Sequence, residues 1–295
     1  METLVKASDS RIWEVIPRQP TLSQIATGFG FTEGPVWCGE YLLFSDIPRN
    51  RIVKLSTLSH GPEVTTFRYP SGNSNGLTMD VSGRLIACHH SLRCITRTEI
   101  DGSVSVLADR YKGKRLNSPN DVVVKSDGSI YFTDPPYGLK NFVIWKEIEF
   151  NGVYRFSPDG ELTLLVDDFE RPNGLAFSPD ESVLYINDTA KKHIRAFDTD
   201  ADGNLSNERI IDMQGAEPGA PDGMKVDSQG NIFCTGPGGL WVIDPSGKPL
   251  GCIAIPELPA NLAWGDPDLK TLYITARSSI YSLQLEIPGI VVWVT

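Results

Sequence analysis

The stretch PNDVVVKSDGSIYFTD, residues Pro119–Asp134, contains two short β-rich runs with a turn between them. A Pro-Asn-Asp triplet opens it, three valines follow, and Ser126–Gly128 separates them from the run Ile130–Thr133. Valine, isoleucine and aromatic residues favour strands, whereas Asp-Gly favours a tight turn. The stretch therefore predicts a polar residue, a strand, a turn and a second strand, in that order.

The same unit recurs along the chain. PNGLAF at Pro172–Phe177 and PDGMKV at Pro221–Val226 are each followed by a turn and a second β-rich run, and looser copies lie elsewhere. The polar residues that mark the six copies are spaced 39 to 53 positions apart: Glu33, Asn75, Asn120, Asn173, Asp222 and Asn261. Six units of that size, each with three or four strands, predict an all-β fold, a six-bladed β-propeller.

Each blade of such a ring buries its faces against its neighbours, so residues 1–295 are expected to form a single domain. Residues 1–30 precede the first repeat and contain Leu22 and Ile25 in a possible strand. A propeller usually closes by pairing segments from both ends of the chain. We expect the N-terminal segment and Ile290–Val294 to share that closure.

The charge balance limits the possible partners. The chain has 27 basic and 37 acidic residues, a formal net charge of −10. This disfavours nonspecific binding to nucleic acid or to an anionic membrane. The longest apolar runs span four to six residues, far below the roughly 20 of a membrane helix. No nucleic-acid or membrane partner is predicted, and the sequence does not define an oligomeric state.

The cysteines bear on the compartment. There are five, an odd number without CxxC spacing, which indicates reduced thiols. The first eleven residues are polar and lack the apolar run of a signal peptide. A cytoplasmic protein is the expectation.

The marker residues predict a metal site. Each opens the innermost strand of its blade, so the six should converge at one end of the central channel. Polar side chains are costly to bury without partners, and a hard cation removes that cost. Carboxylate and amide oxygens are ligands for calcium or magnesium, whereas softer metals call for the His or Cys side chains that no marker position holds.

Several motifs resemble the senescence marker protein/gluconolactonase family, the regucalcin-like lactonases. They extend from Thr32 to Thr275 and include TEGP at Thr32–Pro35, LNSPND at Leu116–Asp121 and FTDPPYG at Phe132–Gly138. RPNG at Arg171–Gly174 and APDG at Ala220–Gly223 complete the set. The second and third motifs look closest to the bacterial gluconolactonases.

The resemblance implies a six-bladed propeller with one divalent cation at the channel mouth. Its ligands here would be Glu33, Asn173 and Asp222, with Asn120 as a fourth ligand or a substrate contact. Calcium is the expected ion, with magnesium, manganese and zinc as alternatives. The regucalcin branch has a substrate-binding arginine where this chain has Ser118. Another residue, Arg115 or His90, is therefore expected to recognise the sugar.

These features predict a metal-dependent hydrolase of sugar lactones such as glucono-1,5-lactone. A cation can polarise the lactone carbonyl, and Asp222 is our candidate base. A hydroxide on the metal is the alternative base, and the sequence does not choose between them. The expected substrate contacts are Asn75, His90, Arg115, Asn120 and Tyr137, the last in a loop that could cover the pocket.

Two other functions remain open from the sequence. One is an esterase or phosphotriesterase activity on the same scaffold, because fold does not determine substrate. The other is a non-enzymatic calcium-binding propeller. Asp198–Gly203 opens like an EF-hand loop but has Arg209 where that motif needs a glutamate, so a hairpin is expected there. No Gly-x-Ser-x-Gly motif for a serine nucleophile is present.

Overall fold

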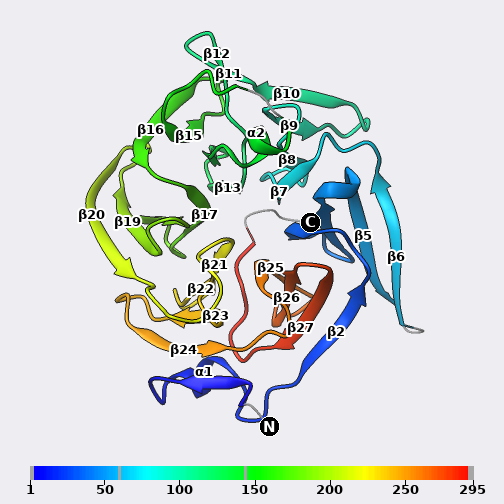
Figure 1. Ribbon diagram of the computed structural model, residues 1–295, viewed down its shortest axis with the longest axis vertical. Coiled ribbons are helices and arrows are strands. Elements are labelled where there is room, and N and C mark those ends of the chain that lie inside the picture. Colours follow the sequence, from blue (N-terminus) through cyan, green and yellow to red (C-terminus); the bar gives the residue numbers. More distant parts are fainter. Residues whose placement is uncertain (1–2, 59–60, 143–144, 292–295) are drawn as a thin grey trace.

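Six antiparallel sheets are arranged radially around a central channel, as Figure 1 shows. The computed structural model describes residues 3–58, 61–142 and 145–291. The arrangement confirms the six-bladed β-propeller predicted from the repeat. In the described part of the chain, neither α-helix has the length and apolar character of a membrane span.

The first three blades are each built from four consecutive strands, innermost first. Blade 1 contains β3 (Thr32–Trp37), β4 (Leu42–Asp46), β5 (Arg51–Leu58) and β6 (Gly61–Arg68). Blade 2 contains β7 (Ser74–Met79), β8 (Leu85–His89), β9 (Cys94–Thr98) and β10 (Val104–Ala108). Blade 3 contains β13 (Val122–Val124), β14 (Ile130–Asp134), β15 (Asn151–Phe156) and β16 (Leu162–Phe169).

The last three blades include the N-terminal strands. Blade 4 contains β17 (Pro172–Phe177), β18 (Val183–Asp188), β19 (His193–Thr199) and β20 (Leu205–Asp212). Blade 5 contains β21 (Met224–Val226), β22 (Ile232–Gly236), β23 (Gly239–Ile243), β24 (Pro249–Ile253) and β1 (Val5–Ala7). Blade 6 contains β25 (Pro259–Gly265), β26 (Thr271–Ala276), β27 (Ser279–Gln284) and β2 (Leu22–Thr27).

The remaining elements are short. A hairpin of β11 (Arg110–Tyr111) and β12 (Lys114–Arg115) links blades 2 and 3. The helices are α1 (Ile12–Val15), α2 (Tyr137–Phe142) and the 3₁₀ turn η1 (Ile47–Arg49). The loop predicted around Tyr137 is therefore wrong in part, since α2 begins there. Six residues are too few for a helical hydrophobic pattern to be visible in the sequence. The hairpin predicted at Asp198–Gly203 is present between β19 and β20.

The two ends of the chain behave differently. β2 pairs with β27 through Leu22 and Leu283, so the predicted strand around Leu22 is the outermost strand of the last blade (Figure 1). Gly289 makes a single bridge with Asp227, but Ile290 and Val291 form no strand. The rest of the stretch expected to help close the ring, from residue 292 on, lies outside the described residues.

Apolar side chains fill all six interfaces between neighbouring blades. Each hydrophobic cluster takes its members chiefly from two adjacent blades: Phe132 and Tyr154 of blade 3, for example, pack with Ile86 of blade 2. Fully burying one such side chain contributes about 1.5–3 kcal/mol. Trp37 of blade 1 stacks on Tyr273 of blade 6 at 5.7 Å, so the closing interface is packed like the others.

Candidate functional site

Five of the six marker residues line one cavity at the mouth of the channel. Its volume is about 340 Å³. Glu33, Asn75 and Asn173 are the second residues of β3, β7 and β17, and Asn120 and Asp222 shortly precede β13 and β21, so the starts of five innermost strands meet at this mouth. The lining residues are Phe31, Glu33, Ile47, Pro48, Asn75, His90, Asn120, Tyr137, Asn173, Thr189 and Asp222.

Strand irregularities turn the marker side chains toward the channel. The pairing register shifts beside Glu33 in β3, Asn75 in β7, Asn173 in β17 and Asn261 in β25. Such bulges re-aim a side chain and end regular pairing. Asn120 and Asp222 instead lie two residues before β13 and β21. All six side chains are thus freed from the strict in-and-out alternation of a strand.

A chain of amides crosses three blades. Asn75 Nδ2 donates to Asn120 Oδ1 at 2.6 Å, and Asn120 Nδ2 donates to Asn173 Oδ1 at 2.6 Å. Asn173 Nδ2 in turn donates to Thr189 Oγ1 at 3.1 Å. These contacts fix the orientation of three amides around the cavity. Asn75 Oδ1 is buried and has no hydrogen-bond partner among the described residues.

The carboxylates of Glu33, Asp121 and Asp222 come from blades 1, 3 and 5 and lie close together. Burial, and then the charges of Asp222 and Asp121, raise the pKa of Glu33 well above its ordinary value. Burial, with a further contribution from Asp121, raises the pKa of Asp222 to about 7. Asn261 Nδ2 donates to Glu33 Oε2 at 3.0 Å and lies 3.3 Å from Asp121 Oδ2. Buried carboxylates this close together repel one another when ionised, and a cation between them would remove that repulsion.

These residues fit a hard cation. Glu33, Asp222, Asn173 and Asn120 present carboxylate and amide groups to one cavity, and the unpartnered Asn75 Oδ1 adds an acceptor. Across the described ranges, no three His, Cys, Asp or Glu side chains are placed to share one metal ion. A site here would therefore combine carboxylates with amide oxygens, the donor set of calcium and magnesium.

The two adjacent histidines have different surroundings. His90 lines the cavity, and its Nε2 lies 3.1 Å from Asn75 Nδ2. Burial lowers the pKa of His90 to about 4, so the ring is neutral at pH 7. Its Nδ1 has no partner in the described structure. His89 points away, with its ring nitrogens 2.7 Å from Ser71 O and Thr96 Oγ1.

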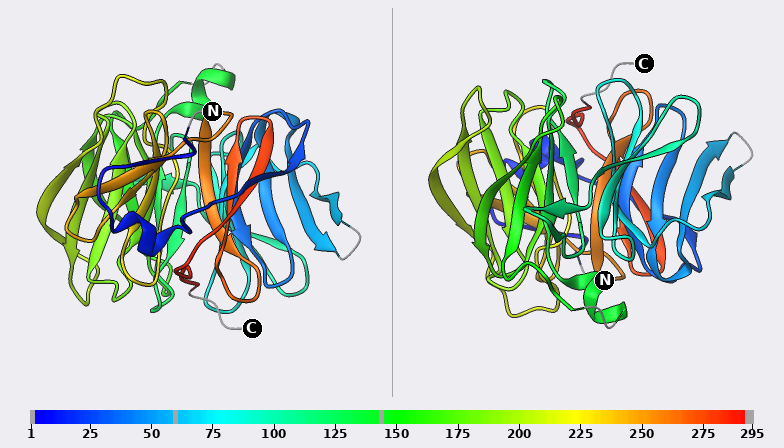
Figure 2. Two further views of the ribbon diagram at one scale, coloured as in Figure 1. Left: turned by 90° about the horizontal axis from the view of Figure 1, so that it is seen from below. Right: turned by 90° about the horizontal axis from the view of Figure 1, so that it is seen from above.

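The helix α2 stands on the cavity face of the ring, as Figure 2 shows. Its first residue, Tyr137, lines the cavity, and burial raises the pKa of this phenol to about 12. Gly138 N donates to Ser118 Oγ at 2.8 Å. A Cβ on Gly138 would lie 2.7 Å from His90 Cβ, so only glycine allows this approach. Ser118 thus anchors the segment that carries Tyr137.

Asp134 binds the backbone next to Ser118 and so also supports the segment that carries Tyr137. Its two carboxylate oxygens each accept a backbone N–H at 2.7 Å, one from Asn117 and one from Ser118. Burial raises the pKa of Asp134 to about 7. Asp134 ends β14 and precedes Pro135 and Pro136, so it holds together the two loops beneath Tyr137.

The structure does not bring Arg115 to the cavity. Its Nη2 donates to Leu92 O at 2.6 Å, its backbone N donates to Glu147 Oε2 at 2.9 Å, and the residue is absent from the cavity lining. Asn261 also lies behind the lining, where it bridges carboxylates. Four lining residues belong to no repeat motif and were not predicted from the sequence: Phe31, Ile47, Pro48 and Thr189.

The chain is similar to several known proteins over most of its length. The chain is 35% identical to the gluconolactonase of Zymomonas mobilis, in an alignment that covers 95% of this chain and 85% of that protein. It is 29% identical to a pentonolactonase of Haloferax volcanii, covering 82% and 80%. A solved gluconolactonase structure from Xanthomonas campestris superposes with a TM-score of 0.88 at 34% identity, covering 96% and 95%.

The family model described as the SMP-30/Gluconolactonase/LRE-like region matches residues 31–278, which include every residue that lines the cavity. The match begins beside β3 and ends beside β27, so it extends across all six blades. The chain belongs to the SMP-30/gluconolactonase family.

Proposed function

We propose that this protein hydrolyses sugar lactones to the free acids with the help of one divalent cation. The observation that carries the proposal is the convergence of Glu33, Asn173 and Asp222 on one cavity with the amides of Asn75 and Asn120. Lactonases among the relatives support the reaction. The metal requirement rests on the donor set.

Calcium is the proposed ion, held by Glu33, Asn173 and Asp222 with Asn120 as a fourth ligand. Oxygen donors of both charge types suit it, and magnesium or manganese could use the same groups. When bound, the cation supplies Lewis-acid polarisation of the lactone carbonyl. The remaining work falls to side chains of the chain itself.

Asp222 is the proposed general base. It accepts a proton from water as the water oxygen forms a bond to the carbonyl carbon, and the proton then passes to the ring oxygen as the ring C–O bond breaks. Burial raises the pKa of Asp222 to about 7 in the cation-free chain, and a bound cation would lower it. The support for this role is therefore positional, because Asp222 lines the cavity beside the other candidate ligands.

The cavity wall supports an uncharged polar substrate. Asn75, His90 and Tyr137 offer hydrogen bonds to sugar hydroxyls, and Phe31 with Ile47 forms an apolar side for the carbon face of the ring. Among the described lining residues there is no lysine or arginine, and His90 is neutral at pH 7. Glucono-1,5-lactone is therefore our first candidate substrate.

A second candidate activity is hydrolysis of less polar esters at the same site. The apolar side formed by Phe31, Ile47 and Pro48 favours it. A purely calcium-binding role is less well supported, because the candidate ligands face an open cavity of about 340 Å³.

The five cysteines are all free thiols, which supports a reducing compartment such as the cytoplasm.

The test is a pH-indicator assay of glucono-1,5-lactone hydrolysis. Chelated protein is compared with protein refilled with calcium, magnesium, manganese or zinc, and with the variants Asp222→Ala and Asp268→Ala. Asp268 is an exposed aspartate far from the lining and serves as the matched control. We expect acid release above the spontaneous rate, lost on chelation and in Asp222→Ala only. Metal-loaded, folded protein that gives no excess rate would exclude this substrate.

A further inference from the structure

One buried carboxylate at the site has no role as a proposed ligand. Asp121 is 2% exposed and does not line the cavity. Asn261 Nδ2 nevertheless contacts both Asp121 Oδ2, at 3.3 Å, and Glu33 Oε2, at 3.0 Å. The charge of Asp121 also raises the pKa of Asp222. Asp121 therefore places a third negative charge beside the two carboxylates that would hold a cation.

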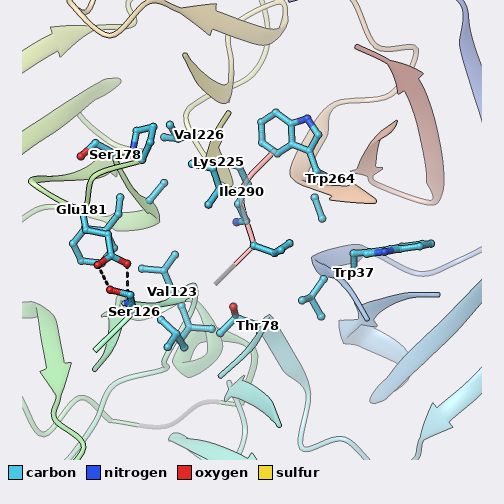
Figure 3. A pocket seen from close by; sticks show the side chains of 18 of the residues that line it. Trp37, Thr78, Val123, Ser126, Ser178, Glu181, Lys225, Val226, Trp264 and Ile290 are labelled. Carbon is cyan, nitrogen blue, oxygen red and sulfur yellow. Dashed lines mark hydrogen bonds between the residues drawn. The ribbon is translucent and has the colours of Figure 1, made fainter. Parts of the chain in front are cut away.

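A lysine reaches this cluster from the other end of the channel. A second cavity of about 530 Å³ lies there, and Figure 3 shows Lys225 among its lining side chains, with Trp264 and Ile290 nearby. Within the described lining of both cavities, Lys225 is the only lysine or arginine. Its side chain is 23% exposed.

The ammonium group of Lys225 is directed toward the carboxylates. Nζ lies 3.9 Å from Asp121 Oδ2 and donates to Asn261 Oδ1 at 3.4 Å and to Met224 O at 3.1 Å. Asn261 thus contacts the ammonium through its oxygen and two carboxylates through its nitrogen. These contacts fix the ammonium behind the candidate site, where it would repel a cation bound in the cavity that Glu33 and Asp222 line.

We propose that Lys225 is the internal counter-ion of Asp121 and sets the charge of the site to suit one divalent ion. With all three carboxylates ionised around a bound cation, they and the ammonium have a summed charge of minus two, which a single divalent cation neutralises. This rests on the cation site of the proposed function. It assigns a selectivity role to a residue that is not a ligand.

Removing the ammonium should strengthen cation binding. At an effective dielectric constant of about 50, between that of a protein surface and that of bulk water, one unit charge about 10 Å away changes the affinity for a divalent ion by about tenfold. The repulsion scales with ion charge, so a trivalent ion gains more than a divalent one. Lys225→Met should therefore tighten calcium binding by about tenfold and terbium binding by about thirtyfold.

The experiment measures the binding of calcium by titration calorimetry and of terbium by luminescence to the cation-free full chain. Lys225→Arg retains the charge and is the matched control. Asp121→Asn/Lys225→Met restores the local charge of minus two and should bind both ions as the wild type does. Thermal unfolding of each variant reports whether it is folded, and the double variant serves if Lys225→Met does not fold.

The inference is supported if Lys225→Met shifts the terbium-to-calcium preference while Lys225→Arg and the double variant do not. It is overturned if folded Lys225→Met, or the double variant relative to Asp121→Asn alone, shows unchanged affinities. Unchanged affinities would overturn only the role of Lys225 and would not contradict the proposed lactone hydrolysis. A wild-type chain that binds neither ion overturns the cation site itself, and lactone hydrolysis by chelated protein then decides the fate of the proposed reaction.

Discussion

The side-chain amide of Asn261 donates to the carboxylate of Glu33 at 3.0 Å, although 228 positions separate the two residues in the chain. Asn261 belongs to β25 of blade 6 and Glu33 to β3 of blade 1. A hydrogen bond between the last blade and the first is thus also part of the candidate cation site. The site can be complete only when the ring is closed.

Glu33→Gln should remove cation binding and stabilise the cation-free fold. The pKa of Glu33 is raised in the fold, so its ionised form opposes folding as the pH rises through that raised value. Glutamine has no such charge. At pH 8 we expect a higher Tm for the variant without metal, no further rise on adding calcium, and at least about a hundredfold loss of lactonase activity. Calcium titration during thermal unfolding checks this.

The matched control is Glu63→Gln on the exposed strand β6. It should retain the calcium-dependent rise in Tm of the wild type. A Glu33→Gln chain that calcium still stabilises as it does the wild type contradicts the assignment of Glu33 as a ligand.

Gly34→Ala should disrupt the interface between blades 1 and 2. Gly34 has a φ of +52°, and a Cβ there would overlap the backbone oxygen of Asn75. Gly83 has a φ of +72° but no atom within 4 Å of a Cβ. Gly83→Ala should cost about 1 kcal/mol of the unfolding free energy, from backbone strain alone. Gly34→Ala should cost about 3 kcal/mol or more because it adds a steric clash. Equal losses in urea unfolding would refute the clash.

Ser118→Ala should weaken substrate binding more than turnover. The variant removes the acceptor for Gly138 N and so loosens the start of α2, which carries Tyr137. We expect KM for glucono-1,5-lactone to rise about fivefold, close to the cost of one hydrogen bond, with kcat nearly unchanged. Ser118→Thr keeps the hydroxyl and should retain more of the wild-type KM. A fall in kcat at constant KM would argue against a positioning role.

His89→Gln should reduce the acid sensitivity of the fold. Burial lowers the pKa of His89 from 6.5 to about 4, so the unfolded chain binds the extra proton between these values. Stability from this group is present above pH 6.5 and is lost as the pH falls toward 4. Between pH 7 and 5 that loss is about 2 kcal/mol. Urea unfolding at both values checks whether the variant loses less than the wild type. His193→Gln, at a partly exposed histidine, should change this difference less.

The regular spacing of the six marker residues was the feature of the sequence that predicted most of this fold. It predicted the six blades, and it named Glu33, Asn75, Asn120, Asn173 and Asp222, which the structure brings to one cavity. The reason is geometric, because equivalent positions in radial blades must converge on the axis. The short polar motif recurs because each blade starts its innermost strand in the same way.

The rest of the site depends on contacts that no repeat encodes. Thr189 follows a second strand, and Ile47 and Pro48 lie in η1, so their approach to the cavity is set by loop paths. Arg115 was predicted, as an alternative to His90, to replace the arginine that is absent at Ser118, yet in the β11–β12 hairpin its guanidinium donates to Leu92 O. Composition and spacing carry no signal for either outcome.

The pairing of β2 with β27 also affects how the chain can fold. Gln24 of β2 hydrogen-bonds Ser279 of β27, 255 positions later. The strand β2 therefore lacks its native partner until the chain has been synthesised through β27. Contacts of such sequence separation slow folding. Throughout synthesis, the half-apolar β2 segment is exposed to other nascent chains, and a chaperone that shields it would raise the yield of closed rings.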